Sequence, residues 1–260
     1  MTGLKDIIGT LCNLRLPLYL ARADIRQRYR RSTLGPFWIT ISTGVMIGTM
    51  ALIFGQIFKA PMAELLPFLA AGLILWSFIS STLIESTEVF TNAQAIIRQL
   101  PLPLFTHVVR LVARSFYIFL HNSIIIICVL LFFKQNIGVV TFLSFLGLAL
   151  LILNLLWLSL LLGIFCARFR DLTQIVSSVL QIFFYLTPII WLPSLLPEKT
   201  SLMLLETNPF YHLIEIVRAP LLNQYPSFSD WLFSALLCSL GWIITILLFN
   251  KYRARIAYWL

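Results

Sequence analysis

The stretch Val139–Ala167, VVTFLSFLGLALLILNLLWLSLLLGIFCA, carries no charged side chain and decides the class of the fold. A helix needs about 20 apolar residues to cross the roughly 30 Å hydrocarbon core of a bilayer. Five more segments reach or nearly reach this length: Pro36–Phe58, Leu66–Val89, Leu111–Phe133, Gln174–Leu192 and Trp231–Phe249. We therefore expect an all-α transmembrane protein with six spans.

The basic residues are distributed unevenly between these spans. Of 19 Lys and Arg, seven precede the first span, three lie between or beside spans two and three, two between spans four and five, and three after the last. Only four lie in the remaining gaps. Positive charge is retained on the cytoplasmic side of a membrane, so this asymmetry predicts a multi-pass protein with both termini in the cytoplasm.

Composition agrees with this class of protein. The mean hydropathy is +0.93, with 60% apolar and 11% charged residues, which excludes an ordinary soluble domain. The net charge of +9 is explained by the topology, so no nucleic acid partner is implied. The first apolar run begins only at Pro36, so we expect no cleavable signal peptide. The cysteines share no metal-ligand or disulfide spacing: Cys12, Cys128, Cys166 and Cys238.

Catalytic and nucleotide-binding motifs are absent from the sequence. There is no GxxxxGK[ST] phosphate loop, no HExxH zinc motif and no GxSxG nucleophile turn. We therefore expect no catalytic residue, metal site or cofactor in this chain. Active transport would draw energy from an ion gradient or another subunit. Because no carboxylate lies near the middle of a span, a separate ATPase that binds ATP and Mg is favoured.

Residues 1–35 are predicted to form a cytoplasmic amphipathic helix at the interface, and residues 36–260 the transmembrane domain. From Leu18, one helical face carries Leu18, Ala21, Ile25 and Tyr29, and a neighbouring face carries Arg22, Arg26 and Arg30. Asp24 and Arg28 are spaced to pair. Such a helix lies on membrane lipids with its arginines on anionic phosphates. The arginines either fix the topology alone or also dock a partner protein.

The loop 91–110 is the second region of interest. Helical periodicity continues from the second span to Arg98, and Pro101 and Pro103 should end it. Leu100, Leu102 and Leu104 are apolar residues in a short basic turn. This pattern is typical of a docking surface, although Arg98, Arg110 and Arg114 also serve as topology markers.

The outer loop 193–230 is unusually apolar. Asn208 is a good N-cap and Pro209 suits the first helical position. The apolar stripe that follows is Phe210, Leu213, Ile214, Val217 and Leu221, with His212, Glu215 and Arg218 on the polar side. A helix of this length is too short to span, which predicts short re-entrant or interfacial helices between spans five and six. Glu215 and Arg218 are spaced to pair with each other.

Polar residues within the spans carry the remaining expectations. Glu85 and Glu88 should pair with arginines of the N-terminal helix. Span five presents Gln174, Ser177, Ser178, Gln181 and Tyr185 on roughly one face. That stripe lines a hydrated path or forms hydrogen bonds between helices. Gly44 and Gly48 form a GxxxG pattern that permits close approach of helices, across a dimer axis for example.

Several of these segments together resemble the ABC-2 type permeases that export bacterial surface polysaccharides. The run Arg26-x-x-Tyr29-x-x-Ser32-x-Leu34-Gly35-Pro36-x-Trp38 is similar to the start of their first span. Asn92…Ile97-Arg98…Leu100-Pro101-x-Pro103 resembles their cytoplasmic loop, with Arg98 and Leu100 where Lys and Phe are expected. Leu186-Thr187-Pro188-Ile189, then Asn208-Pro209 and Arg218, resembles their fifth span and outer loop. The resemblance covers essentially the whole chain.

The resemblance implies a six-helix, type V exporter-like permease in the bacterial inner membrane. It would form a homodimer, bind two copies of a P-loop ATP-binding subunit, and export lipid-linked polysaccharide, most often undecaprenyl diphosphate-linked O antigen. The residues assigned to ATPase coupling are Arg26, Tyr29, Arg30, Arg98, Leu100, Pro101, Leu102 and Pro103. The substrate channel is assigned to Phe37, Trp38, Gln174, Ser178, Gln181, Phe184 and Tyr185. The outer gate is assigned to Asn208, Pro209, Glu215 and Arg218.

Aromatic residues make up 14% of the chain, and their faces can stack on sugar rings. An interfacial belt of Trp and Tyr accounts for part of this content without any role in transport. Two alternatives remain open. One is an ABC-2 permease for teichoic acid, a capsule on another lipid, or a drug. The other is a membrane enzyme or scaffold with no ATPase partner.

Overall fold

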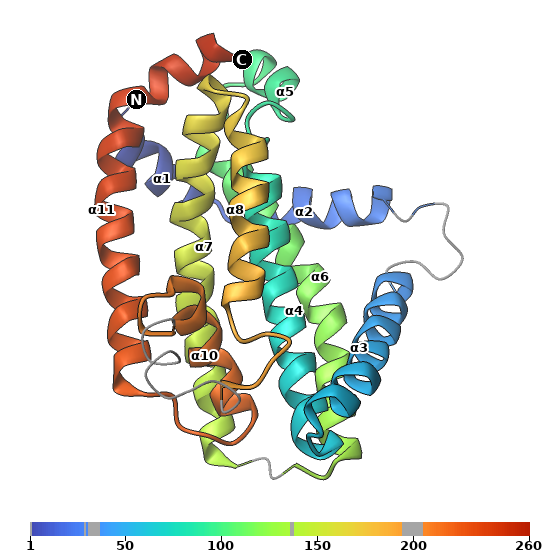
Figure 1. Ribbon diagram of the computed structural model, residues 1–260. Helices are drawn as coiled ribbons and strands as arrows, with labels where there is room; N and C mark the ends of the chain where they lie inside the picture. The colour runs from blue at the N-terminus through green and yellow to red at the C-terminus, as the bar shows by residue number, and fades with distance from the viewer. Residues whose placement is uncertain (1, 29, 31–36, 136–137, 194–204) are drawn as a thin grey trace.

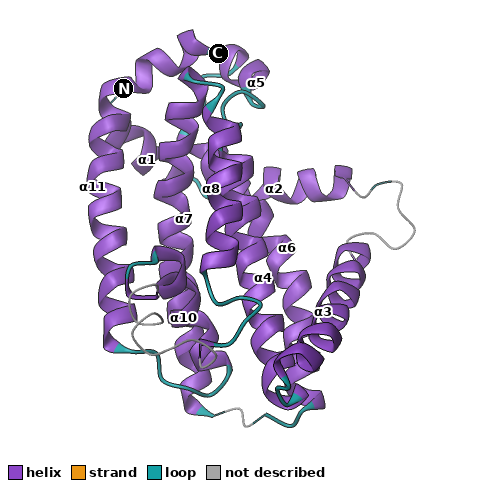
Figure 2. Ribbon diagram, viewed as in Figure 1, coloured by secondary structure: helices purple, strands orange, loops and turns teal. Residues whose placement is uncertain are grey.

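A computed structural model describes the chain except for residues 1, 29, 31–36, 136–137 and 194–204. The described residues form helices joined by turns and loops, with no strand among them (Figure 2). The expectation of an all-α protein is therefore confirmed for this part of the chain. Pro36, the predicted first residue of span one, lies outside it.

Among the described residues, five helical segments are long and apolar enough to cross a membrane. They are α3 (Phe37–Phe58), α4 (Met62–Ser86), α6 (Phe105–Phe132), η1 (Val139–Phe142) continued by α7 (Leu143–Arg168), and α11 (Phe228–Trp259). Each overlaps one of the predicted spans, and they stand side by side as a bundle (Figure 1). The chain is thus a multi-pass membrane protein.

The fifth predicted span, Gln174–Leu192, is too long. Its helix α8 runs from Leu172 to Leu186, and the residues that follow, to 193, are not α-helical. Pro188 explains the early end, because it lacks an amide donor and disfavours helix at Thr187. With 15 residues, α8 is shorter than the length expected of a full span.

Helix α4 forms the centre of the bundle and α3 lies at its edge. In the most apolar window of each helix, 67% of α4 but only 11% of α3 is buried within the chain. Leu75 and Ile79 of α4 pack in the same core as Phe119 of α6 and Leu151 of α7. Gly48 of α3 has no neighbour within 4 Å of where a Cβ would stand, so the GxxxG face is partly open.

Close packing of α7 depends on small residues and one buried amide. A Cβ on Gly241 of α11 would lie 2.2 Å from the ring of Trp157, so the two helices approach only with glycine there. Asn154 accepts a hydrogen bond from Trp157 Nε1 at 3.0 Å and donates to the Ser234 carbonyl at 3.3 Å. These contacts fix α11 against α7 and leave the buried amide satisfied.

The N-terminal segment forms two helices instead of the single helix predicted from Leu18. These are α1 (Gly3–Cys12) and α2 (Arg15–Arg28), separated at Asn13, whose backbone is not helical. α2 projects sideways from the bundle, as a helix lying along a membrane surface would (Figure 1). α1 approaches the end of α11, where the Leu4 amide donates to Asn250 Oδ1 at 3.1 Å. Both termini therefore lie at one end of the bundle.

Candidate functional site

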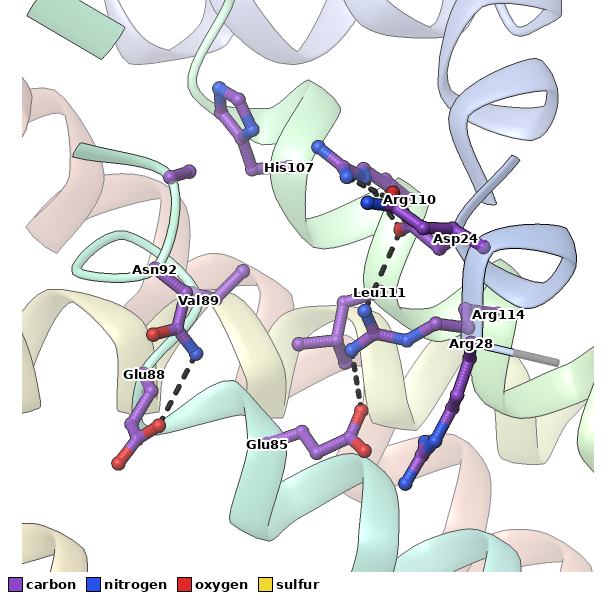
Figure 3. A pocket seen from close by; sticks show the side chains of 12 residues that line it. Asp24, Arg28, Glu85, Glu88, Val89, Asn92, His107, Arg110, Leu111 and Arg114 are labelled. Atoms are coloured by element: carbon purple, nitrogen blue, oxygen red, sulfur yellow. Dashed lines mark hydrogen bonds and ion pairs between the residues drawn. The ribbon is translucent and has the colours of Figure 1, made fainter. Parts of the chain in front are cut away.

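An ion-pair network joins α2, α4 and α6 at the end of the bundle that holds the termini (Figure 3). Arg110 donates to both carboxylate oxygens of Asp24, from Nε at 2.7 Å and from Nη2 at 2.5 Å. Arg114 lies between two acids, 3.5 Å from Asp24 and 2.6 Å from Glu85. Two-point contact by a planar guanidinium restrains orientation as well as distance. The network therefore holds α2 against the first turns of α6.

This network corrects two predicted pairings. Asp24 pairs with Arg110 and Arg114 of α6 rather than with Arg28 of its own helix. Glu85 pairs with Arg114 rather than with an arginine of the N-terminal helix, and Glu88 accepts from Asn92 Nδ2 at 3.2 Å. The physical reason is that α2 packs along α6, which brings longer-range partners closer than the helical neighbour. Sequence spacing alone does not show this packing.

A cavity of about 580 Å³ lies beside the network, between α2, α4, the turn 87–93 and α6. Three carboxylates and three guanidinium groups line it, together with His107. His107 is 3% exposed, and neither ring nitrogen has a hydrogen-bond partner among the described residues. The charged lining residues are Asp24, Arg28, Glu85, Glu88, Arg110 and Arg114.

The predicted docking loop lies at the same end of the molecule. The short helix α5 (Gln94–Gln99) carries Arg98 and ends before Pro101, as predicted, and the Leu102 amide then donates to the Leu100 carbonyl at 2.8 Å, which turns the chain at Pro101. Arg98, Leu100 and Pro101 are exposed, whereas Leu102 and Pro103 are partly covered. The loop therefore offers both a positive charge and apolar surface to a partner.

The N-terminal residues assigned to coupling are not joined to this loop. Arg26 and Arg30 are exposed, and no hydrogen bond or ion pair links either side chain to the loop within the described residues. Tyr29 lies outside the described residues. The structure thus presents two separate surfaces at the end that holds the termini rather than one combined site.

A buried carboxylate missed by the sequence analysis supports the end of the docking loop. Asp6 of α1, with 0% exposure, accepts from the amides of Leu104 and Phe105 at 3.1 and 3.0 Å. Its Oδ2 also lies 2.7 Å from Arg253 Nε of α11. An anion at these amides caps the N-terminus of α6 and matches its dipole. A signal was present, since Asp6 and Asp24 are the only acids in the basic segment before the first span.

The polar stripe assigned to the channel runs along one open face of α8. Gln174, Ser178, Gln181 and Tyr185 are all exposed, and they recur at the spacing of one helical face. Within the described chain, the side chains of Gln174, Ser178 and Gln181 have no hydrogen-bond partner. The alternative that they bond neighbouring helices of the same chain is therefore not supported.

The aromatic residues assigned to the channel fall into two separate places. Phe184 of α8 packs near Trp76 of α4, with ring centroids 5.9 Å apart. Phe37 and Trp38 are exposed at the start of α3, where Phe37 meets the edge of His121 at 6.2 Å. Since α3 packs on α4 and α6 while α8 packs on α4 and α7, one chain does not bring Phe37 or Trp38 to the stripe.

At the opposite end, α10 (Pro209–Leu221) has the predicted cap. Asn208 Oδ1 accepts from the amides of Phe210 and Tyr211 at 3.0 and 3.3 Å, and Pro209 occupies the first helical turn. Asn208 Nδ2 also donates to Thr187 Oγ1 at 2.8 Å. The cap thus links α10 to the segment that follows α8.

The polar side predicted for α10 faces protein rather than water. Arg218 is 1% exposed and forms the expected pair with Glu215 through Nε and Nη2, at 3.0 and 2.6 Å. Nη1 donates to the Pro188 carbonyl at 2.5 Å, and the guanidinium lies 3.9 Å from the ring centroid of Phe68. Packing of α10 between α4, α7 and α11 removes this face from solvent and fixes it to the end of α8.

His212 forms a second link on α10. Its Nδ1 lies 2.6 Å from Asp230 Oδ1, its Nε2 lies 3.1 Å from the Glu206 carbonyl, and its ring stacks on Phe233. Burial alone would lower the pKa of His212, but the hydrogen bonds to Asp230 and the Glu206 carbonyl outweigh it and raise the pKa. The contact between His212 and Asp230 therefore holds α10 to the start of α11, where Ser227 and Asp230 form a capping box.

Comparison with known proteins gives a consistent result. Residues 18–222 match the family described as ABC-2 type transporter. Two curated proteins, both named O-antigen export system permease protein RfbA and both from Klebsiella pneumoniae, are 27% identical to this chain over 274 and 266 residues. Each alignment covers 98% of this chain and 97% of the relative.

Proposed function

Because this chain belongs to the ABC-2 type transporter family, we propose that it is the membrane permease of a polysaccharide exporter in the bacterial inner membrane. The observation that carries the proposal is similarity over nearly the full chain to two O-antigen export permeases. Two copies of the permease would assemble with two copies of an ATP-binding subunit. The permease is a transport subunit, and ATP hydrolysis with Mg would take place on its partner.

The proposed topology has six passages with both termini in the cytoplasm. Support comes from the basic residues at the end that holds the termini and from the position of α8, which leads away from that end beside α7 (Figure 1). α8 and the non-helical residues after it would complete one passage. Their irregular backbone is covered by α10, through Arg218 and the Pro188 carbonyl, as non-helical backbone in a membrane requires.

Coupling would begin at the docking loop. A partner surface would contact Arg98, Leu100 and Pro101, and movement of the loop would reach α6 directly, because α6 begins at Phe105. The ion pairs of Arg110 and Arg114 would then carry the movement to α2. Arg26, Tyr29 and Arg30 would form a second contact with the ATP-binding subunit or with lipid phosphates.

The transport path would include the open face of α8. Gln174, Ser178 and Gln181 supply hydrogen-bonding groups that have no partner within the chain, and Tyr185 supplies a ring for stacking on sugars. A second copy would have to complete the path, since one chain leaves this face open. Between transport strokes, α10 with Asn208, Pro209, Glu215 and Arg218 would close the outer end.

The cargo is proposed to be undecaprenyl diphosphate-linked O antigen, and teichoic acid, capsule or another ABC-2 cargo is the alternative. Gln181→Leu and Tyr185→Ala test the path in cells. Both variants should lower surface polysaccharide while leaving ATPase association unchanged, because Gln181 and Tyr185 lie in the part of α8 that leads away from the docking loop (Figure 1). The matched control is Ser239→Ala, at an exposed position on α11. Wild-type glycan levels in both variants would assign the stripe to packing between subunits.

A further inference from the structure

The charged cavity between α2, α4 and α6 lies at the depth of lipid headgroups. In α4, the uncharged sequence Leu65–Leu83 ends just before Glu85, and in α6 no charged residue follows Arg114 up to Phe132. α2 forms one wall and projects sideways from the bundle (Figure 1). Charged residues at the ends of apolar spans lie where headgroups begin. A phospholipid headgroup is therefore available to this cavity.

Cationic and donor groups in the lining remain unpaired. Nε of Arg114 and both ring nitrogens of His107 are buried without a hydrogen-bond partner. Arg28, at the end of α2, forms no ion pair with any described residue. Buried polar groups in folded proteins nearly always have a partner. The cavity therefore lacks an acceptor for Arg114 Nε and for the ring N–H of His107, whereas Arg28 is an exposed cation at its edge.

One carboxylate in the lining also lacks a cation. Asp24 and Glu85 are neutralised by Arg110 and Arg114. Glu88 is exposed, and within the described residues its carboxylate is bonded only to the uncharged amide of Asn92; Figure 3 shows this pair set apart from Arg28 and Arg114. Unpaired charges of opposite sign thus lie at separate places in one cavity.

We propose that this cavity binds a phospholipid headgroup of the phosphoethanolamine class. The phosphate would meet Arg28 and Arg114 Nε, and the primary ammonium would meet Glu88. A volume of about 580 Å³ accommodates such a group with water. A headgroup with only a negative charge leaves Glu88 unpaired, and a choline headgroup has no N–H to donate to it. The proposal stands apart from the transported cargo and does not depend on it.

Native mass spectrometry of the full-length protein tests the proposal. The purified permease is incubated with micelles that contain equal amounts of phosphatidylethanolamine, phosphatidylcholine and phosphatidylglycerol, and the retained lipid is counted. Phosphatidylethanolamine should be retained about tenfold over the other two, the effect of one charge-assisted hydrogen bond. Arg28→Gln should lower its retention about tenfold, and Arg28→Lys should restore most of it.

Glu88→Gln should abolish the preference for phosphatidylethanolamine over phosphatidylcholine without lowering the retention of phosphatidylcholine. The controls are Arg255→Gln and Glu64→Gln, which are exposed positions on α11 and α4 outside the cavity, and neither should change retention. Equal retention of the three lipids would overturn the proposal. A preference for phosphatidylglycerol that is lost in Arg28→Gln but kept in Glu88→Gln would overturn it in favour of an anion site.

Discussion

Replacing Asp6 with Ala should destabilise the end of the bundle that holds the termini. The change removes the acceptor of two helix N-terminal amides, Leu104 and Phe105, and the partner of Arg253. Loss of a cap costs about 1 kcal/mol, and an unpaired, largely covered guanidinium adds about 2 kcal/mol. The sum of about 3 kcal/mol corresponds to a fall of about 6–12 °C in the apparent Tm of a chain of this size.

The assay is thermal unfolding of the purified protein followed by fluorescence-detected size exclusion. Asp6→Asn should lower the apparent Tm by about half as much as Asp6→Ala does, because the Asn amide oxygen can still accept from one backbone amide. The double variant Asp6→Ala with Arg253→Gln should lower the apparent Tm by less than the sum of the two single falls, since both changes break the same ion pair. Asp171→Ala, at an exposed acid, is the control. A shift below about 2 °C for Asp6→Ala would refute the assigned role of α1.

Three further predictions concern docking of the ATP-binding subunit, the membrane topology and the pH dependence of stability. Leu100→Asp, but not Gln99→Asp, should reduce co-purification of the ATP-binding subunit at least fivefold, and unchanged recovery would move docking elsewhere. The topology is tested in a chain whose natural cysteines are replaced by Ser, with an impermeant thiol reagent added outside sealed cells. Tyr225→Cys should react with the reagent and Arg98→Cys should not. Labelling of Arg98→Cys would contradict the proposed topology. The pKa of His212 is raised in the folded state. The stabilisation that His212 gives the folded state is therefore present at low pH and lost as the pH rises from about 6.5 through the raised pKa. The apparent Tm of the wild type should then fall as the pH rises above about 6.5 and that of His212→Gln should fall less, and equal slopes would refute the link.

The long apolar helices could be predicted from sequence because the bilayer imposes their length and composition. α7 and α11 required only hydropathy, and the cap at Asn208 required only local rules, since Asn followed by Pro is a local signal. The end of α8 was misplaced because an apolar segment continues past Thr187 although the helix does not. Pro188 was the available signal for that end.

The polar contacts of the candidate site could not be predicted, because they join residues distant in sequence. Asp24 lies 86 residues from Arg110, and Asp6 lies 247 residues from Arg253. Helical spacing predicts only neighbours such as Glu215 and Arg218, and that pair is confirmed. Burial of Arg218 also depends on how α10 packs, which amphipathic periodicity does not determine.

Reconstitution tests whether the permease and its ATPase together move lipid-linked O antigen across a membrane. The tagged permease is purified with its P-loop ATPase and placed in proteoliposomes that carry a fluorescent lipid-linked O antigen on the ATPase-facing leaflet. We expect ATP to move the glycan to the opposite leaflet. Substitution of the phosphate-loop lysine in the ATPase should stop this movement while the complex remains assembled. A permease that recruits no P-loop ATPase, or glycan movement that proceeds equally without ATP, would contradict the proposed function.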